Sequence, residues 1–125
     1  MKRIIIPGRL PGLNDAFNLA RTNRQLEAKE RRKNEDFIIF CIRRYLRGWR
    51  ANGPVILHYT FIEPNRRRDK DNVAGYARKL IQDSLVKAGT LKGDGWNYIE
   101  NSTEAWGVDK AHPRVLVDIE EVNSK

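Results

Sequence analysis

Hydrophobic and polar residues follow one another along the chain in blocks that predict strands and helices in turn. A β-branched run from Lys2 to Ile6, which ends at Pro7, is typical of a first strand. From about Asp15 to Trp49 the spacing of apolar residues becomes helical. The apolar face of this helical region consists of Ile38, Ile42, Tyr45, Leu46 and Trp49. The charged part at residues 29–36 is expected as an exposed helical turn or a mobile loop.

The second half of the chain repeats the order of strand and helix. Residues 55–62 alternate as a strand, and residues 73–88 form the clearest helix. Its apolar face consists of Val73, Ala77, Leu80, Ile81, Ser84, Leu85 and Ala88. Strand segments are expected at 96–99 and 103–108, then a hairpin turn at 111–113 and a last strand at 114–122. The pattern predicts a single α+β domain of residues 1–125, with a mixed sheet of about four strands and two main helices.

The charge of the chain indicates the class of partner, and its cysteine content excludes two kinds of site. The 24 Lys and Arg residues outnumber the 16 Asp and Glu residues, for a net charge of +8. This excess favours a polyanion, most commonly nucleic acid, although an anionic membrane or simple solubility would also fit. The single cysteine, Cys41, excludes an intrachain disulfide framework and a cysteine-rich zinc site. No apolar run is long enough to span a membrane or to serve as a signal peptide, so we expect a cytoplasmic location and no membrane partner.

The segment RRRDKDN at residues 66–72 concentrates the candidate chemistry. Asp69 and Asp71 are two residues apart, so in an extended or turn segment their side chains face one point while Lys70 faces away. Two carboxylates this close repel each other, and a hard divalent cation such as Mg²⁺ or Mn²⁺ relieves the repulsion. The preceding arginines match the geometry of phosphate oxygens. The alternative is a solvated charged turn in which Asp71 or Asn72 caps the next helix.

Asp94 is the candidate for a third metal ligand, because it lies between two glycines in a turn. A helix over residues 73–88 is about 24 Å long, and six extended residues after it cover about 20–22 Å at most. The return to Asp69 and Asp71 is therefore marginal if the helix begins at Val73 and comfortable if it begins near Gly75. Otherwise Asp94 would complete a site on a partner subunit. The sequence leaves these options open.

Three segments, RRRDKDN, KLIQDSLVKAG and GDGW, resemble the core of the RusA-type endodeoxyribonucleases, the phage-associated Holliday junction resolvases. The resemblance covers about residues 60–98. It aligns Asp69 and Asp71 with the first two metal-binding aspartates of that family and Asp94 with the third. Two departures stand out: Gly93 replaces a frequent aspartate, and Gly75 stands where the family has a lysine. Alignment from the end of the helix assigns that lysine to Lys79, with four residues inserted.

The resemblance implies a Mg²⁺-dependent endonuclease, with Mn²⁺ as a possible substitute and no organic cofactor. It implies a homodimer that cuts a four-way DNA junction by two symmetric nicks. Lys79 would offset charge in the transition state. The residues expected to bind the DNA backbone are Arg66, Arg67, Arg68 and Lys70. Two other functions remain open: a non-catalytic basic DNA-binding module, and a metal-dependent nuclease for flap or other branched DNA.

Overall fold

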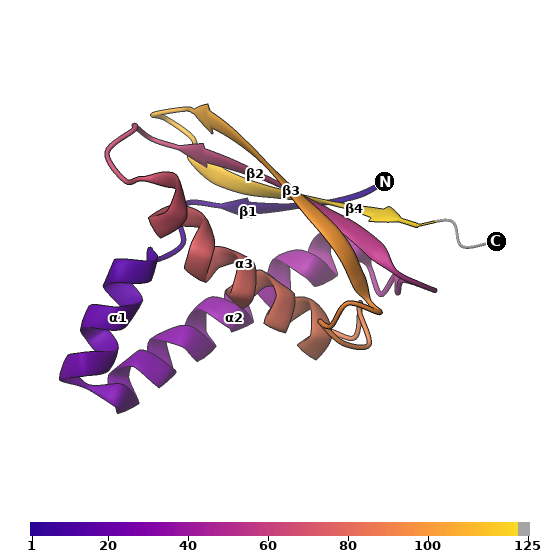
Figure 1. Ribbon diagram of the computed structural model, residues 1–125, viewed down its shortest axis with the longest axis horizontal. Coiled ribbons are helices and arrows are strands. Elements are labelled where there is room, and N and C mark those ends of the chain that lie inside the picture. Colours follow the sequence, from indigo (N-terminus) through magenta and orange to yellow (C-terminus); the bar gives the residue numbers. More distant parts are fainter. Residues whose placement is uncertain (123–125) are drawn as a thin grey trace.

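The computed structural model describes residues 1–122, which form four strands and three helices (Figure 1). The strands are β1 (Lys2–Pro7), β2 (Val55–Glu63), β3 (Ile99–Val108) and β4 (Arg114–Glu121). The helices are α1 (Leu13–Thr22), α2 (Arg24–Leu46) and α3 (Lys70–Lys87). The helices lie together on one side of a mixed sheet, as Figure 1 shows. The predicted α+β class is confirmed.

The strand order of the sheet is β1-β4-β2-β3. β4 runs antiparallel to both of its neighbours, so Val117 lies between Ile4 of β1 and Tyr59 of β2. β2 and β3 run parallel, as expected for two strands that are joined through a helix, here α3. The hairpin predicted at 111–113 is therefore wrong, because β2 lies between the two strands that this turn connects. β3 is left at one edge of the sheet.

The core lies between the helices and the facing side of the sheet. Alternate residues of β2 are buried, from Val55 to Glu63, and the buried face of α3 confirms the predicted apolar spacing except at the half-buried Ala88. The predicted face of α2 is buried at Ile38, Ile42 and Leu46, whereas Tyr45 is exposed. The largest fully buried side chains are Tyr59, Phe61, Ile4, Ile6, Ile38, Leu57, Leu80, Ile81, Leu85 and Ile119.

The helical region predicted from about Asp15 to Trp49 is divided into two helices, so the short helix α1 accompanies the two main helices, α2 and α3. The division falls at Asn23, whose backbone is extended and whose Oδ1 accepts a hydrogen bond from the Leu26 N–H. Asparagine is a favoured N-cap because its side chain satisfies a backbone donor that the first turn leaves free. None of the helices that the structure describes combines the length and apolar character needed to cross a membrane.

The charged part of α2 is helical and mostly exposed, as in the first of the two predicted options, but one of its acids is buried. Residues 29–36 are helical, and the Glu35 side chain is only 5% exposed. Its Oε1 accepts a hydrogen bond of 2.7 Å from Nζ of Lys87, at the end of α3. A buried carboxylate needs such a partner, because removal from water strongly disfavours its charge. The ion pair therefore joins the two long helices.

Replacement of Lys87 by alanine should destabilise the fold, because Glu35 would stay buried without its cation. We expect the free energy of unfolding to fall by about 1–2 kcal/mol, less than for a fully buried pair since Lys87 is partly exposed. Urea denaturation followed by circular dichroism measures the change. Lys33→Ala is the matched control on the exposed side of α2 and should alter stability by less than about 0.5 kcal/mol.

Candidate active site

The loop between β2 and α3 carries the arginine run and is held in place by Arg68. The Arg68 guanidinium donates hydrogen bonds of 3.1 and 3.0 Å to the two carboxylate oxygens of Glu63, and a third of 3.1 Å to the carbonyl of Leu10. Arg9 donates a further bond of 3.0 Å to Glu63 Oε1. Arg68 therefore has a structural role, and its DNA-binding role stays a prediction, whereas Arg66 is exposed to solvent.

The sequence prediction missed Glu63 as a residue of this region. Its side chain is 11% exposed and lies between two arginines at the end of β2. A signal for it does exist in the sequence. Val55, Leu57, Tyr59 and Phe61 occupy the inward positions of the strand, and the next inward position is an acid. An acid at an inward position predicts a buried carboxylate with cationic partners.

The two central carboxylates lie at the first turn of α3. The helix begins at Lys70, and Asp69 is its N-cap: Oδ1 of Asp69 accepts a hydrogen bond of 2.9 Å from the Asn72 N–H. The alternative in which Asp71 or Asn72 caps the helix is therefore wrong. Asp71 is exposed in the first turn. Both carboxylates lie at the positive end of the helix macrodipole, which favours negative charge there.

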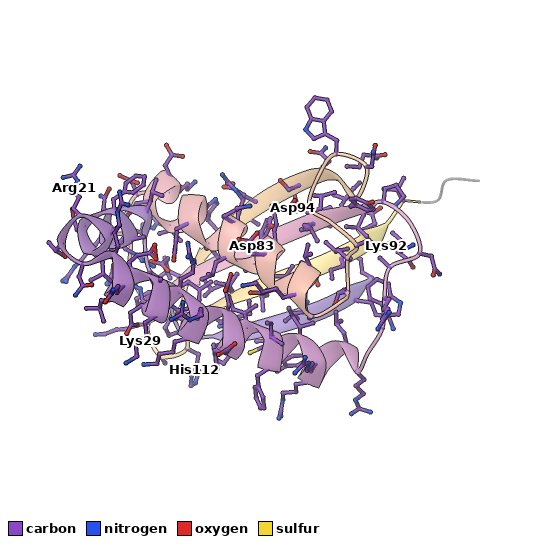
Figure 2. All side chains as sticks on the ribbon, turned by 90° about the horizontal axis from the view of Figure 1, so that it is seen from below. Arg21, Lys29, Asp83, Lys92, Asp94 and His112 are labelled. Atoms are coloured by element: carbon purple, nitrogen blue, oxygen red, sulfur yellow. The ribbon has the colours of Figure 1, made fainter. Side chains whose placement is uncertain are left out.

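Asp94 lies beside the C-terminal half of α3 and is not grouped with Asp69 and Asp71. Its Oδ2 accepts a hydrogen bond of 3.2 Å from Nζ of Lys79, which also pairs with Asp83 at 3.1 Å. Figure 2 labels the two acids, Asp83 and Asp94. Lys79 comes eight residues after Asp71, about 12 Å further along the helix axis. Across residues 1–122, no three side chains of His, Cys, Asp or Glu are grouped so that they could hold one metal ion.

The option in which the three aspartates meet within one chain is therefore wrong, because α3 begins earlier in the sequence than that option requires. A helix that begins at Lys70 is longer than one that begins near Gly75, so the loop after it returns only as far as Lys79. Gly75 is an internal helical residue that packs against α1. A Cβ on it would lie 3.4 Å from a methyl carbon of Leu13. The option in which Asp94 serves a partner subunit stays a prediction.

Two features of the Asp94 region bear on its chemistry. Hydrogen bonds to Asp83 and then to Asp94 raise the pKa of Lys79, so its ammonium stays charged through neutral pH and cannot act as a base. Gly93 lies under the ring of Tyr98, and a Cβ at this position would come within 2.8 Å of the ring carbons. This close approach explains why a glycine precedes Asp94.

A hollow of about 800 Å³ opens beside Asp69, between the ends of β2 and β3 and the start of α3. Its walls combine charge with apolar surface, since Trp106 and Val108 line it together with Asp69 and Lys70. The indole of Trp106 stacks on Phe61, with ring centroids 4.8 Å apart. The Lys70 ammonium lies 5.5 Å from the Trp106 centroid. The sequence prediction identified Lys70 as a candidate but not this cation–π contact.

Comparison with known protein families finds no family model that matches the chain, and comparison with curated proteins finds no match either. The resemblance to RusA-type endonucleases therefore rests on the motifs at residues 66–72, 79–89 and 93–96. The functional proposal depends on the chemistry of these residues and on their positions in the fold.

Replacement of Arg68 by alanine should lower stability, whereas replacement of Arg67 by alanine should lower DNA affinity. Arg68→Ala removes a bidentate partner of buried Glu63, so we expect a loss of about 2–3 kcal/mol in the free energy of unfolding. Arg67 is exposed, so Arg67→Ala should leave stability within about 0.5 kcal/mol of the original protein. It should instead weaken DNA binding and reduce the slope of log K against log salt by about 1. Chemical denaturation and a salt titration of DNA affinity measure both effects.

Proposed function

We propose that the protein is a Mg²⁺-dependent, structure-selective endodeoxyribonuclease that acts as a homodimer on branched DNA, including four-way junctions. The observation that carries the proposal is the pair Asp69 and Asp71 at the positive end of α3, beside an exposed arginine loop. The net charge of +8 supports a polyanionic substrate. Hard carboxylate oxygens suit Mg²⁺, and phosphate is the substrate group that arginine and Mg²⁺ both bind.

The metal site requires carboxylates from two chains. One chain supplies Asp69 and Asp71. Their carboxylate oxygens suit a hard divalent cation, but two carboxylates are too few protein ligands for the proposed site. Asp94 of the partner subunit would complete the set. Lys79 would arrive with that aspartate, because the two side chains are hydrogen-bonded. When bound, a divalent ion would lower the pKa of a water molecule and stabilise the oxygen that leaves the cleaved phosphodiester.

The remaining residues would position the substrate and balance its charge. Arg66 and Arg67 are exposed beside the carboxylates and would bind backbone phosphates without reading the base sequence. The Lys79 ammonium, held charged by its carboxylate partners, would offset negative charge that builds up on the phosphoryl oxygens. Lys70 would contribute a further phosphate contact from the rim of the hollow. None of these roles needs an organic cofactor.

A homodimer with two such sites matches the symmetry of a four-way junction. Both the dimer and the junction can share a two-fold axis, so each site would face one of two equivalent strands. Paired nicks at these strands would separate the junction into two duplexes. A flap or other branched substrate lacks this symmetry and needs only one of the two sites.

Replacement of Asp71 by asparagine tests the chemistry directly. We expect cleavage of a four-way junction in Mg²⁺ to fall by at least about a hundredfold, because a metal ligand is lost. DNA binding should persist or tighten slightly, since one negative charge is removed from a DNA-binding surface. Cleavage is measured on labelled four-way, flap and linear DNA. Asp36→Asn, at an exposed position of α2, is the matched control for the loss of one carboxylate and should cleave normally.

The two alternative functions give different outcomes in the same assay. A non-catalytic basic module would bind all the DNA forms and cut none of them, before or after the substitution. A nuclease for flaps would cut the flap substrate and leave the four-way junction intact. Either outcome would contradict the junction-resolving part of the proposal.

Mixing two inactive variants tests whether the site is shared between subunits. Asp71→Asn and Asp94→Asn homodimers should both be inactive. A mixed dimer contains one intact site, built from Asp69 and Asp71 of one chain and Asp94 of the other. After random exchange, about a quarter of the sites should be restored. These dimers should nick one strand of the junction without resolving it, which denaturing and native gels distinguish.

A site formed within one chain gives the opposite result. Each chain of the mixed dimer would then carry one disabling substitution, so mixing would restore no nicking at all. Re-mixing each variant with itself is the control for the exchange procedure.

A further inference from the structure

The exposed face of α2 carries a stripe of aromatic and cationic side chains that the proposed function does not use. Successive members are four, three, four and three residues apart, a spacing that keeps them on one side of a helix. The stripe covers about 21 Å along the helix axis. Its members, the α2 stripe, are the exposed residues Lys33, Phe37, Phe40, Arg44 and Arg47.

The α2 stripe faces away from the rest of the domain. α2 packs against α1, α3 and β1, and its buried side chains include Ile38 and Ile42. Phe40 and Ile42 are two residues apart, so their side chains point about 200° apart around the helix. Phe37 is 41% exposed and Phe40 is 62% exposed. Two exposed phenyl rings one helical turn apart form an apolar patch, which is more informative than a single scattered residue.

The cations of the α2 stripe take no part in holding the fold together. Within residues 1–122, the ion pairs of α2 join Arg31 to Glu27 and Glu35 to Lys87. Neither pair includes a cation of the stripe. Three positive charges beside two phenyl rings are therefore presented to solvent.

Arg47 occupies a backbone conformation that favours glycine. It is the C-cap of α2, and its φ of 51° and ψ of 44° lie in the left-handed region. Apart from glycines, no other residue in the range 1–122 has a positive φ. Glycine adopts this conformation without the steric cost that a Cβ brings, and it is the usual residue where a helix ends in this way. The fold itself therefore does not require an arginine here.

The composition of the α2 stripe favours one class of partner. Its spacing is also that of a coiled-coil seam, but the cations would place charge at three of the five seam positions. A membrane surface needs a broad apolar face, whereas the apolar face of α2 is buried in the core and leaves only Phe37 and Phe40 outside. Aromatic rings next to phosphate-binding cations are what single-stranded nucleic acids require.

We propose that the α2 stripe binds single-stranded nucleic acid, with bases stacked on Phe37 and Phe40 and backbone phosphates bound by the neighbouring cations. Only unpaired bases can stack on the rings, because each base of a duplex is already stacked between its neighbours. Stacking and phosphate contacts do not read the sequence, so the surface would accept any unpaired strand. This binding does not depend on the proposed nuclease.

The α2 stripe lies at the far end of α3 from Asp69 and Asp71. Glu35, two residues before Phe37, accepts a hydrogen bond from Lys87 at the end of α3. The two aspartates lie at the start of this 18-residue helix, about 27 Å away along its axis. A strand bound to the stripe therefore leaves the start of α3 free for other DNA.

The first experiment measures stacking by fluorescence anisotropy with labelled oligothymidine and oligouridine of about 20 nucleotides, in EDTA so that nothing is cut. Phe40→Leu keeps an apolar side chain but removes the ring, so affinity for the single strands should fall about fivefold or more. Affinity for a duplex of the same length should stay within about twofold. Phe40→Tyr keeps the ring and is the matched control. Tighter binding of one oligonucleotide identifies DNA or RNA as the preferred ligand.

The second experiment measures the phosphate contacts by salt titration of the same binding. Arg44→Ala should weaken binding and reduce the slope of log K against log salt by about 0.7, the value for one phosphate of a single strand. Arg32→Ala is the matched control, because Arg32 is exposed on α2 but about 120° around the helix from Arg44. It should leave the slope unchanged.

Arg47→Gly separates a binding role from a structural one. The substitution relieves the left-handed conformation, so Tm should rise by about 2 °C. Affinity for the single strands should nevertheless fall by about threefold or more, because a phosphate contact is lost. Thermal unfolding and anisotropy measure the two effects. A higher Tm with unchanged affinity would contradict the role of Arg47 in binding.

The remaining outcomes separate this surface from other partners and from the enzyme. Equal losses for single strands and duplex with Phe40→Leu, or no loss for either, would overturn the proposal. So would co-sedimentation of the protein with vesicles of phosphatidylserine and phosphatidylcholine that Phe40→Ala abolishes, because a membrane surface would then be identified. Single-strand binding as expected, in a chain that cuts no DNA in Mg²⁺, would support the α2 stripe and contradict the proposed function. Normal junction cleavage without any effect of Phe40→Leu on binding would contradict the stripe alone.

Discussion

The buried carboxylate of Glu63 is the constraint on which the site depends. A charge at the inward end of a central strand is tolerated only where cations compensate for lost hydration, and here Arg68 and Arg9 do so. Arg68 also donates to the carbonyl of Leu10. One side chain thereby joins the end of β2 to the segment before α1. The loop that follows Glu63 is consequently ordered, and it delivers Asp69 to the start of α3 as an N-cap.

α3 then acts as a rigid spacer between two groups of acids. Its buried face is continuous with the core, from Val73 to Leu85, so the helix cannot shorten without the loss of apolar contacts. Asp69 and Asp71 are held at one end and Asp94 near the other half. In the proposed function these two groups are the incomplete halves of a metal site, and a second chain would supply each half with the other.

The arginine run illustrates how neighbouring residues of one type acquire different roles. Arg68 is 17% exposed and is committed to Glu63, while Arg66 and Arg67 extend into solvent. The Arg68 guanidinium stabilises the loop, and those of Arg66 and Arg67 would bind phosphate in the proposed function. Lys79 is a similar case. Its ammonium pairs with both Asp83 and Asp94, so carboxylates fix its position.

The sequence by itself determined the features that depend on local periodicity and residue chemistry: the α+β class, the buried face of α3, and the acids and arginines at its start. It did not locate the break at Asn23, the burial of Glu35, or the insertion of β4 between β1 and β2, because each depends on contacts between distant segments. The position of Asp94 was likewise decided only by tertiary structure. The length of a helix that starts at Lys70, and the loop that returns to Lys79, separate residues that the motif alone would place together.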